Sequence, residues 1–75
     1  MSQSNTVESL AARARDIAAH SPAAKIGTLI IRYADDTTVG ATYDCASDTL
    51  CYTVRGRAAS AEQVAQTLAV YERRR

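Results

Sequence analysis

The sequence predicts one α+β domain in the order helix, three antiparallel strands, helix, with both helices packed on one face of a meander sheet. Two observations favour this fold. Segments 5–20 and 60–75 repeat apolar residues at helical spacing. Between them, three runs rich in β-branched residues are separated by turns short enough to make hairpins. We expect residues 1–75 to form a single domain, with a disordered N-terminus at 1–4.

The first helix is expected to begin at Asn5, because Glu8 follows three residues later in the spacing of a capping box. It should end near His20, since Pro22 disfavours a helical conformation for the residue before it. The apolar residues between these ends share one face of the helix, and they are Val7, Leu10, Ala11, Ala14, Ile17 and Ala18.

The predicted strands span 25–34, 38–45 and 50–55. Directly paired residues must share a face of the sheet. A two-residue turn at Asp35 and Asp36 would break this rule, so we expect a three-residue loop with a bulge. The predicted pairs are Tyr33–Val39, Ile31–Ala41, Leu29–Tyr43, Cys45–Leu50, Tyr43–Tyr52 and Ala41–Val54.

The last helix opens with Ser60 and Gln63, again in capping-box spacing, and closes with the arginines of 73–75, which suit the negative end of a helix. Its apolar stripe is expected to join the first helix on the face that carries Leu29, Tyr43 and Tyr52. Ala41 is small and central, so it should let a helix approach closely. The uncovered face then carries Ile26, Ile30, Thr42, Cys51 and Thr53, with Arg32 and Arg55 on either side of Gly40.

No motif with a chemical mechanism is evident. Cys45 is expected to face the core and Cys51 to face away, so they should not form a disulfide. These cysteines and His20 lack the spacing and the fourth ligand of a zinc site. Asp35 and Asp36 fall on a tight turn, where aspartates are common for conformational reasons. We therefore expect no metal, no cofactor and no enzymatic activity.

The formal net charge is +1, which disfavours strong non-specific binding to nucleic acid. No apolar stretch is long enough to span a membrane, and no hydrophobic run follows the N-terminus as a secretory signal requires. We expect a cytoplasmic protein with reduced thiols.

The order helix, three antiparallel strands, helix resembles that of the double-stranded-RNA-binding domain over most of the chain. The resemblance implies nucleic-acid binding, but two features of that family differ here. Its lysine cluster at the start of the last helix is replaced by Ser60–Ala61–Glu62–Gln63, and its Gly-Pro-containing loop by Asp35–Asp36–Thr37. The alternative function is therefore nucleic-acid binding through arginines of the last loop and helix, namely Arg55, Arg57, Arg73, Arg74 and Arg75.

Binding of a protein partner through the uncovered face is the function we favour. Small domains without motifs are common among phage and mobile-element proteins that inhibit or regulate a larger partner, such as anti-CRISPR proteins, and this is an analogy of size and style. Strand 25–34 is expected at a sheet edge, where it pairs with a second copy, pairs with a strand of another protein, or is protected by Lys25 and Arg32. The predicted contact residues are Ile30, Arg32, Thr42, Thr53 and Arg55, with Asp35 and Asp36 as an alternative acidic contact.

Overall fold

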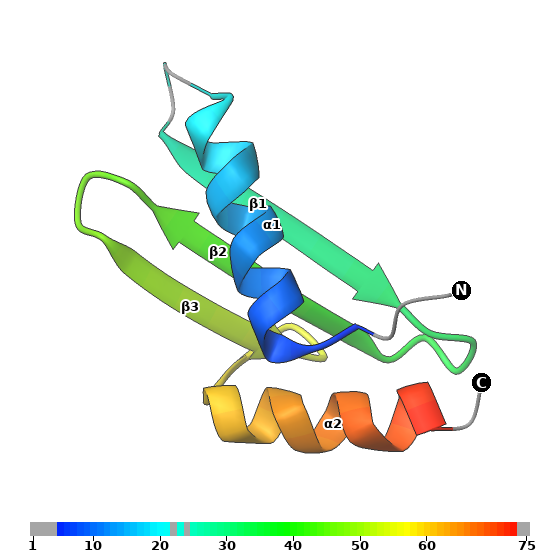
Figure 1. The fold of residues 1–75 in the computed structure, drawn as a ribbon. Coiled ribbons are helices and arrows are strands. Elements are labelled where there is room, and N and C mark those ends of the chain that lie inside the picture. Colours follow the sequence, from blue (N-terminus) through cyan, green and yellow to red (C-terminus); the bar gives the residue numbers. More distant parts are fainter. Residues whose placement is uncertain (1–4, 22, 24, 74–75) are drawn as a thin grey trace.

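The computed structural model describes residues 5–21, 23 and 25–73, so the disorder predicted for 1–4 and the positions of Arg74 and Arg75 lie outside the described residues. Figure 1 shows α1 lying across one face of the sheet and α2 crossing its lower end. The predicted α+β class and element order are confirmed, and the sheet contains one additional short strand. The elements are α1 (Val7–Ala19), β1 (Ile26–Arg32), β2 (Thr38–Asp44), β3 (Thr49–Val54), β4 (Arg57–Ala59) and α2 (Ala61–Arg73).

The sheet is antiparallel in the order β1-β2-β3-β4. The sequence prediction missed β4 and continued the third strand through Arg55. Arg55 and Gly56 both have positive φ, 55° and 79°, as a two-residue type I′ hairpin turn requires. This turn ends β3 at Val54, which pairs with Arg57 of β4. A glycine at the second turn position was the signal available in the sequence.

The predicted strand register was wrong by two residues in both hairpins, although every face assignment within the strands was right. The observed pairs include Leu29–Ala41 and Ile31–Val39 in place of Leu29–Tyr43 and Ile31–Ala41. In the second hairpin Ala41 pairs with Tyr52, and Tyr43 pairs with Leu50. Each loop has its predicted length but lies one residue earlier in the chain. Moving a loop by one residue shifts the register by two, and such a shift keeps each side chain on its face.

The first loop is the predicted three-residue loop, at 34–36 instead of 35–37. The Tyr33 N–H donates to the Thr37 carbonyl at 2.9 Å and closes it. Asp36 occupies the left-handed region with a φ of 68°, and the Asp35 carboxylate accepts from the Thr37 N–H at 3.0 Å. This left-handed residue at the third loop position is the usual device of three-residue hairpin loops.

The second loop covers 45–48, so Cys45 belongs to a turn and not to β2. The Asp44 carboxylate accepts from the Ala46 N–H at 3.0 Å, and Asp48 takes a left-handed φ of 50°. Cys45 is consequently exposed, and its predicted core position was wrong. Cys51 is exposed as predicted, and both residues are free thiols.

The helix caps explain where each helix begins. The Ser60 and Gln63 capping box of α2 is confirmed, with hydrogen bonds of 3.1 and 3.0 Å. The cap of α1 lies one residue later than predicted, at Thr6 with Ser9. Asn5 instead donates its backbone N–H to the Glu72 carboxylate of α2 at 3.1 Å, which ties the start of one helix to the end of the other.

The core lies between the two helices and the inward face of the sheet. Leu10 and Ala14 of α1 and Val64 of α2 are fully buried. Two predicted inward residues, Tyr43 and Tyr52, are only half-buried and pack against the edge of this core. The buried apolar residues that contact one another are Leu10, Ala14, Leu29, Val39, Ala41, Val64 and Leu68.

Candidate functional site

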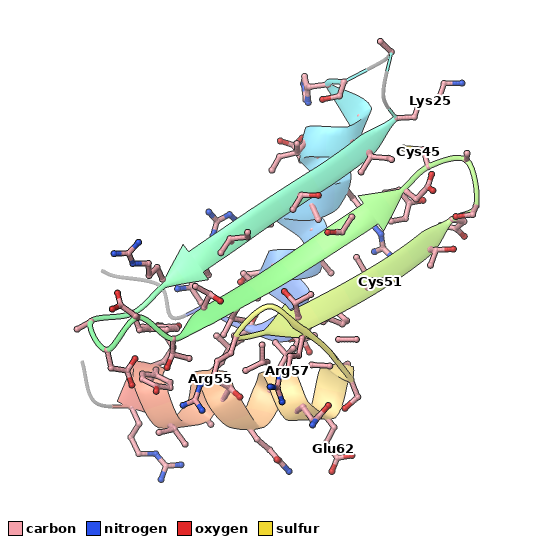
Figure 2. All side chains as sticks on the ribbon, turned by 180° about the vertical axis from the view of Figure 1, so that it is seen from behind. Lys25, Cys45, Cys51, Arg55, Arg57 and Glu62 are labelled. Atoms are coloured by element: carbon pink, nitrogen blue, oxygen red, sulfur yellow. The ribbon has the colours of Figure 1, made fainter. Side chains whose placement is uncertain are left out.

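The face of the sheet away from α1, the open face, carries the most exposed apolar side chains of the strands. Ile30 is 65% exposed and Ile26 is 44% exposed, whereas large aliphatic side chains normally seek burial. Figure 2 views the molecule from behind, and this side of the sheet carries no helix along β1 and β2. The strand residues on the open face include Ile26, Thr28, Ile30, Arg32, Thr38, Gly40, Thr42, Asp44, Thr49, Cys51 and Thr53.

The centre of the open face is closely packed although it is not covered. Gly40 is buried because neighbouring side chains lean over it, with Thr53 Oγ1 at 2.7 Å and Ile30 Cγ1 at 3.4 Å from the position that a Gly40 Cβ would take. Beside them, Thr28 Oγ1 and Thr42 Oγ1 are hydrogen bonded at 3.1 Å. These contacts position aliphatic and hydroxyl groups at the centre of the open face.

Of the predicted contact residues, the structure brings Ile30, Arg32, Thr42 and Thr53 together on the open face. Arg32 Nε lies 3.2 Å from Asp36 Oδ1, and both side chains are well exposed. An exposed pair of this kind contributes little stability, so its main effect is to position the guanidinium at the rim of the face.

The remaining predicted contact residues lie around the first loop. Arg55 does not lie on the open face, because the left-handed turn carries it to the end of the sheet beside α2 (Figure 2). There it lines a shallow hollow with the two predicted acidic residues. This hollow is formed by Asp35, Asp36, Thr37, Thr38 and Arg55.

A polar network, absent from the sequence prediction, fastens the first loop to the end of α2. The Tyr71 hydroxyl donates to the Asp35 carboxylate at 2.5 Å and lies 2.9 Å from Thr37 Oγ1. The Tyr71 ring stacks on Tyr33 with 4.7 Å between centroids, and the Tyr33 hydroxyl donates to Glu72 at 2.5 Å. Thr37 is only 4% exposed as a result. This network holds the acidic loop in one position.

The Asp35 carboxylate is held in its charged form by this network. Hydrogen bonds from the Tyr71 hydroxyl and from the Thr37 backbone and side chain lower the pKa of Asp35 to about 2. A folded-state pKa below the unfolded one gives stability that is present above the unfolded value and is lost as the pH falls through the folded value.

The stability of Asp35→Asn is therefore expected to depend less on pH than that of the wild type between about pH 4 and pH 2. Thermal unfolding followed by circular dichroism across this range measures the difference. Tyr71→Phe removes the main donor to Asp35 and should flatten the profile in the same direction. Identical profiles for all three proteins would show that the hydrogen bonds to Asp35 do not stabilise the folded state.

Of the arginines predicted for nucleic-acid binding, Arg55, Arg57 and Arg73 lie in the described chain, and Figure 2 shows Arg55 and Arg57 near α2. Arg55 lies beside two carboxylates in the hollow of the first loop. Arg57 belongs to β4, and Arg73 is the last residue of α2. Carboxylates beside an arginine repel phosphate groups, so the surroundings of Arg55 do not favour a phosphate contact.

Two further features bear on chemistry. Within residues 5–21, 23 and 25–73, no three His, Cys, Asp or Glu side chains are grouped so that they could hold a metal ion.

A mostly apolar hollow between the start of α1 and the end of α2 was not predicted, and its lining includes Val7, Leu68 and Ala69. The Asn5–Glu72 contact forms part of its wall.

The comparison with models of protein families finds no match, and the comparisons with curated proteins and with solved structures find none either. No helix in the described part of the chain is long and apolar enough to cross a membrane.

Proposed function

We propose that this protein is a non-enzymatic binding module that docks on a protein partner through its open face. The observation that carries the proposal is the exposure of Ile30 and Ile26 on the side of the sheet that α1 leaves uncovered. Fully burying one such side chain contributes about 1.5–3 kcal/mol of free energy. A partner that covers Ile30 or Ile26 would therefore bind more tightly. The surrounding threonines supply hydroxyl groups for hydrogen bonds.

The partner that fits this surface is a protein with a flat or gently curved apolar patch. Arg32 lies at the rim, and arginine at a rim or centre is a common feature of protein interfaces. Asp35 and Asp36 lie next to that rim and offer an acidic contact to the same partner. By analogy of size with phage and mobile-element inhibitors such as anti-CRISPR proteins, the proposed role is to inhibit or regulate a larger machine. The exposed free thiols of Cys45 and Cys51 suit a reducing compartment, so the cytoplasm is the proposed location.

The test compares capture of partners from the source cell by the wild type and by two variants of the open face, Ile30→Lys and Cys51→Lys. Both positions are exposed, so both variants should fold, and each places a charge on the docking surface. We expect each to reduce capture of the specific partner at least tenfold. Val70→Lys is the matched control, because Val70 is also an exposed apolar residue (49%) but lies on α2.

The outcomes separate the alternatives. Retained capture by both open-face variants would contradict docking on that face. Loss of partner capture with Ile30→Lys alone would place the contact along the β1 edge.

Nucleic-acid binding through the arginines is the second proposal. Retention on heparin with a steep salt dependence, reduced by Arg55→Ala and Arg57→Ala, would favour it.

A further inference from the structure

The free edge of β1 presents a regular row of backbone groups. β1 is the first strand of the order β1-β2-β3-β4, so only one of its sides is paired within the chain. The Cys45 N–H bonds to the Lys25 carbonyl and the Tyr33 N–H bonds to the Thr37 carbonyl, each at 2.9 Å. Along an antiparallel strand, every second residue directs its backbone N–H and C=O groups to the same neighbouring strand. Since Lys25 and Tyr33 bond on the β2 side, the odd-numbered residues of β1 bond to β2. The outward N–H and C=O groups are then those of Ile26, Thr28, Ile30 and Arg32.

This edge lacks most of the features that keep strand edges from pairing. β1 is seven residues long and contains neither proline nor an acidic residue. Its one charged side chain, Arg32, is already paired with Asp36. The opposite edge differs, because β4 has only three residues. In Figures 1 and 2 no described strand or helix lies alongside the outer side of β1.

Exposed apolar side chains flank β1 on both faces of the sheet. Ile26 and Ile30 project from the open face. On the helix side, Ile17 of α1 is 38% exposed, and its Cβ lies 3.0 Å from where a Gly27 Cβ would be. An added strand would therefore gain backbone hydrogen bonds along the edge and apolar contacts on both sides of the sheet.

We infer that β1 pairs antiparallel with β1 of a second copy of this chain, about a two-fold axis that passes beside Leu29. This register alone joins all four outward-facing residues of one copy to those of the other. Ile26 pairs with Arg32 of the partner subunit, and Thr28 pairs with Ile30 of the partner subunit. Each such pair exchanges two hydrogen bonds, so no outward N–H or C=O group of β1 is left unpaired. The two four-stranded sheets become one continuous sheet.

The charges at the strand ends favour a second copy as the occupant. In this register the pairing ends at Ile26, and Lys25, which has a left-handed φ of 57°, precedes it at the end of the interface where the partner subunit's acidic loop begins. Each end of the interface thus brings a lysine of one copy towards the acidic loop of the other. Arg32 faces an isoleucine and not a second arginine. With a net charge of +1, two copies repel one another only weakly.

The test is amide hydrogen exchange of the full chain by NMR, together with sedimentation analysis over a range of concentrations. In a dimer, the amides of Ile26, Thr28, Ile30 and Arg32 should be protected like those of their odd-numbered neighbours. Dilution to the monomer should remove protection from these four amides and leave the odd-numbered ones protected. A monomer at every concentration, with the four amides exchanging fast, would overturn the proposal.

Thr28→Pro removes one outward N–H and the exposed side-chain bond to Thr42, but no backbone hydrogen bond to β2. It should therefore be monomeric and folded, as circular dichroism would check. Ala58→Pro is the matched control at the opposite edge. Val54 and Arg57 flank a two-residue turn, so they form a hydrogen-bonded pair of the ladder. The next pair, Thr53 and Ala58, is then not hydrogen bonded, and Ala58 directs its N–H away from β3. It should remain dimeric. A dimer that persists in Thr28→Pro would place the interface elsewhere and contradict the inference.

This inference is independent of the proposed docking face, since its test requires no partner protein. Cys51→Lys lies on β3, away from the β1 edge, and should stay dimeric even where it abolishes partner capture. Ile30→Lys should weaken both properties.

Discussion

Gly27→Ala is expected to lower the free energy of unfolding by about 3 kcal/mol, at the upper end of ordinary overpacking. A Cβ on Gly27 would lie 2.1 Å from the Ala14 carbonyl oxygen and 2.4 Å from the Ala18 nitrogen. Both are backbone atoms of α1, so no side-chain rotation can relieve the contact. The helix would have to move away from β1, and the core around Leu10 and Ala14 would loosen with it.

Urea unfolding followed by circular dichroism measures this loss. Gly40→Ala is the matched control, because its nearest obstacle is the Thr53 hydroxyl at 2.7 Å, the end of a side chain that can rotate. We expect Gly40→Ala to cost at least ~1 kcal/mol less than Gly27→Ala. Equal losses at the two positions, or a stable Gly27→Ala, would show that α1 does not rest on β1 at this point.

The position of this contact could not be predicted from the sequence. The expectation was that a helix would approach the sheet at Ala41, which is indeed 1% exposed and in the core. A helix backbone also approaches Gly27 so closely that a Cβ there would clash with it. Where a helix crosses a sheet depends on its angle to the strands, and the packing of the whole core sets that angle. Periodicity identifies the apolar face of a helix but not its crossing point.

The faces of the strands were predictable because they follow from a period of two. The face assignments stayed correct although the predicted register was wrong, because each register differed by two residues and side chains alternate with a period of two. The loop positions themselves depend on which residue adopts a left-handed conformation. Asp36 and Asp48 adopt it here. Aspartate tolerates this conformation in turns, as asparagine does, so the sequence alone does not show which residue of each turn adopts it.

The same reasoning explains which contact residues were placed correctly. Ile30, Thr42 and Thr53 lie inside strands, where alternation decides their face. Arg55 lies beyond the end of β3, and its positive φ removes it from that pattern. The contact of Tyr71 with Asp35 joins residues 36 positions apart in the chain, and no local pattern reports such a contact.

Leu10→Ala is expected to leave much of the protein unfolded at 25 °C. Leu10 is 0% exposed and belongs to a cluster that contains residues of both helices and of the sheet. Replacing a buried leucine by alanine costs about 2–5 kcal/mol. A lone core in a chain of this size rarely supplies more than about 3–5 kcal/mol, so the loss approaches the whole stability.

Val70→Ala provides the comparison, because Val70 is 49% exposed and its truncation should change stability by no more than about 0.5 kcal/mol. Both variants should be studied in urea at several protein concentrations. If chains pair through β1, association stabilises the folded state by mass action, and the unfolding midpoint of Leu10→Ala should rise with concentration. Adding Thr28→Pro should abolish that rise, because it blocks the edge but leaves the core intact. A Leu10→Ala variant as stable as Val70→Ala at every concentration would mean that the two helices do not share a core.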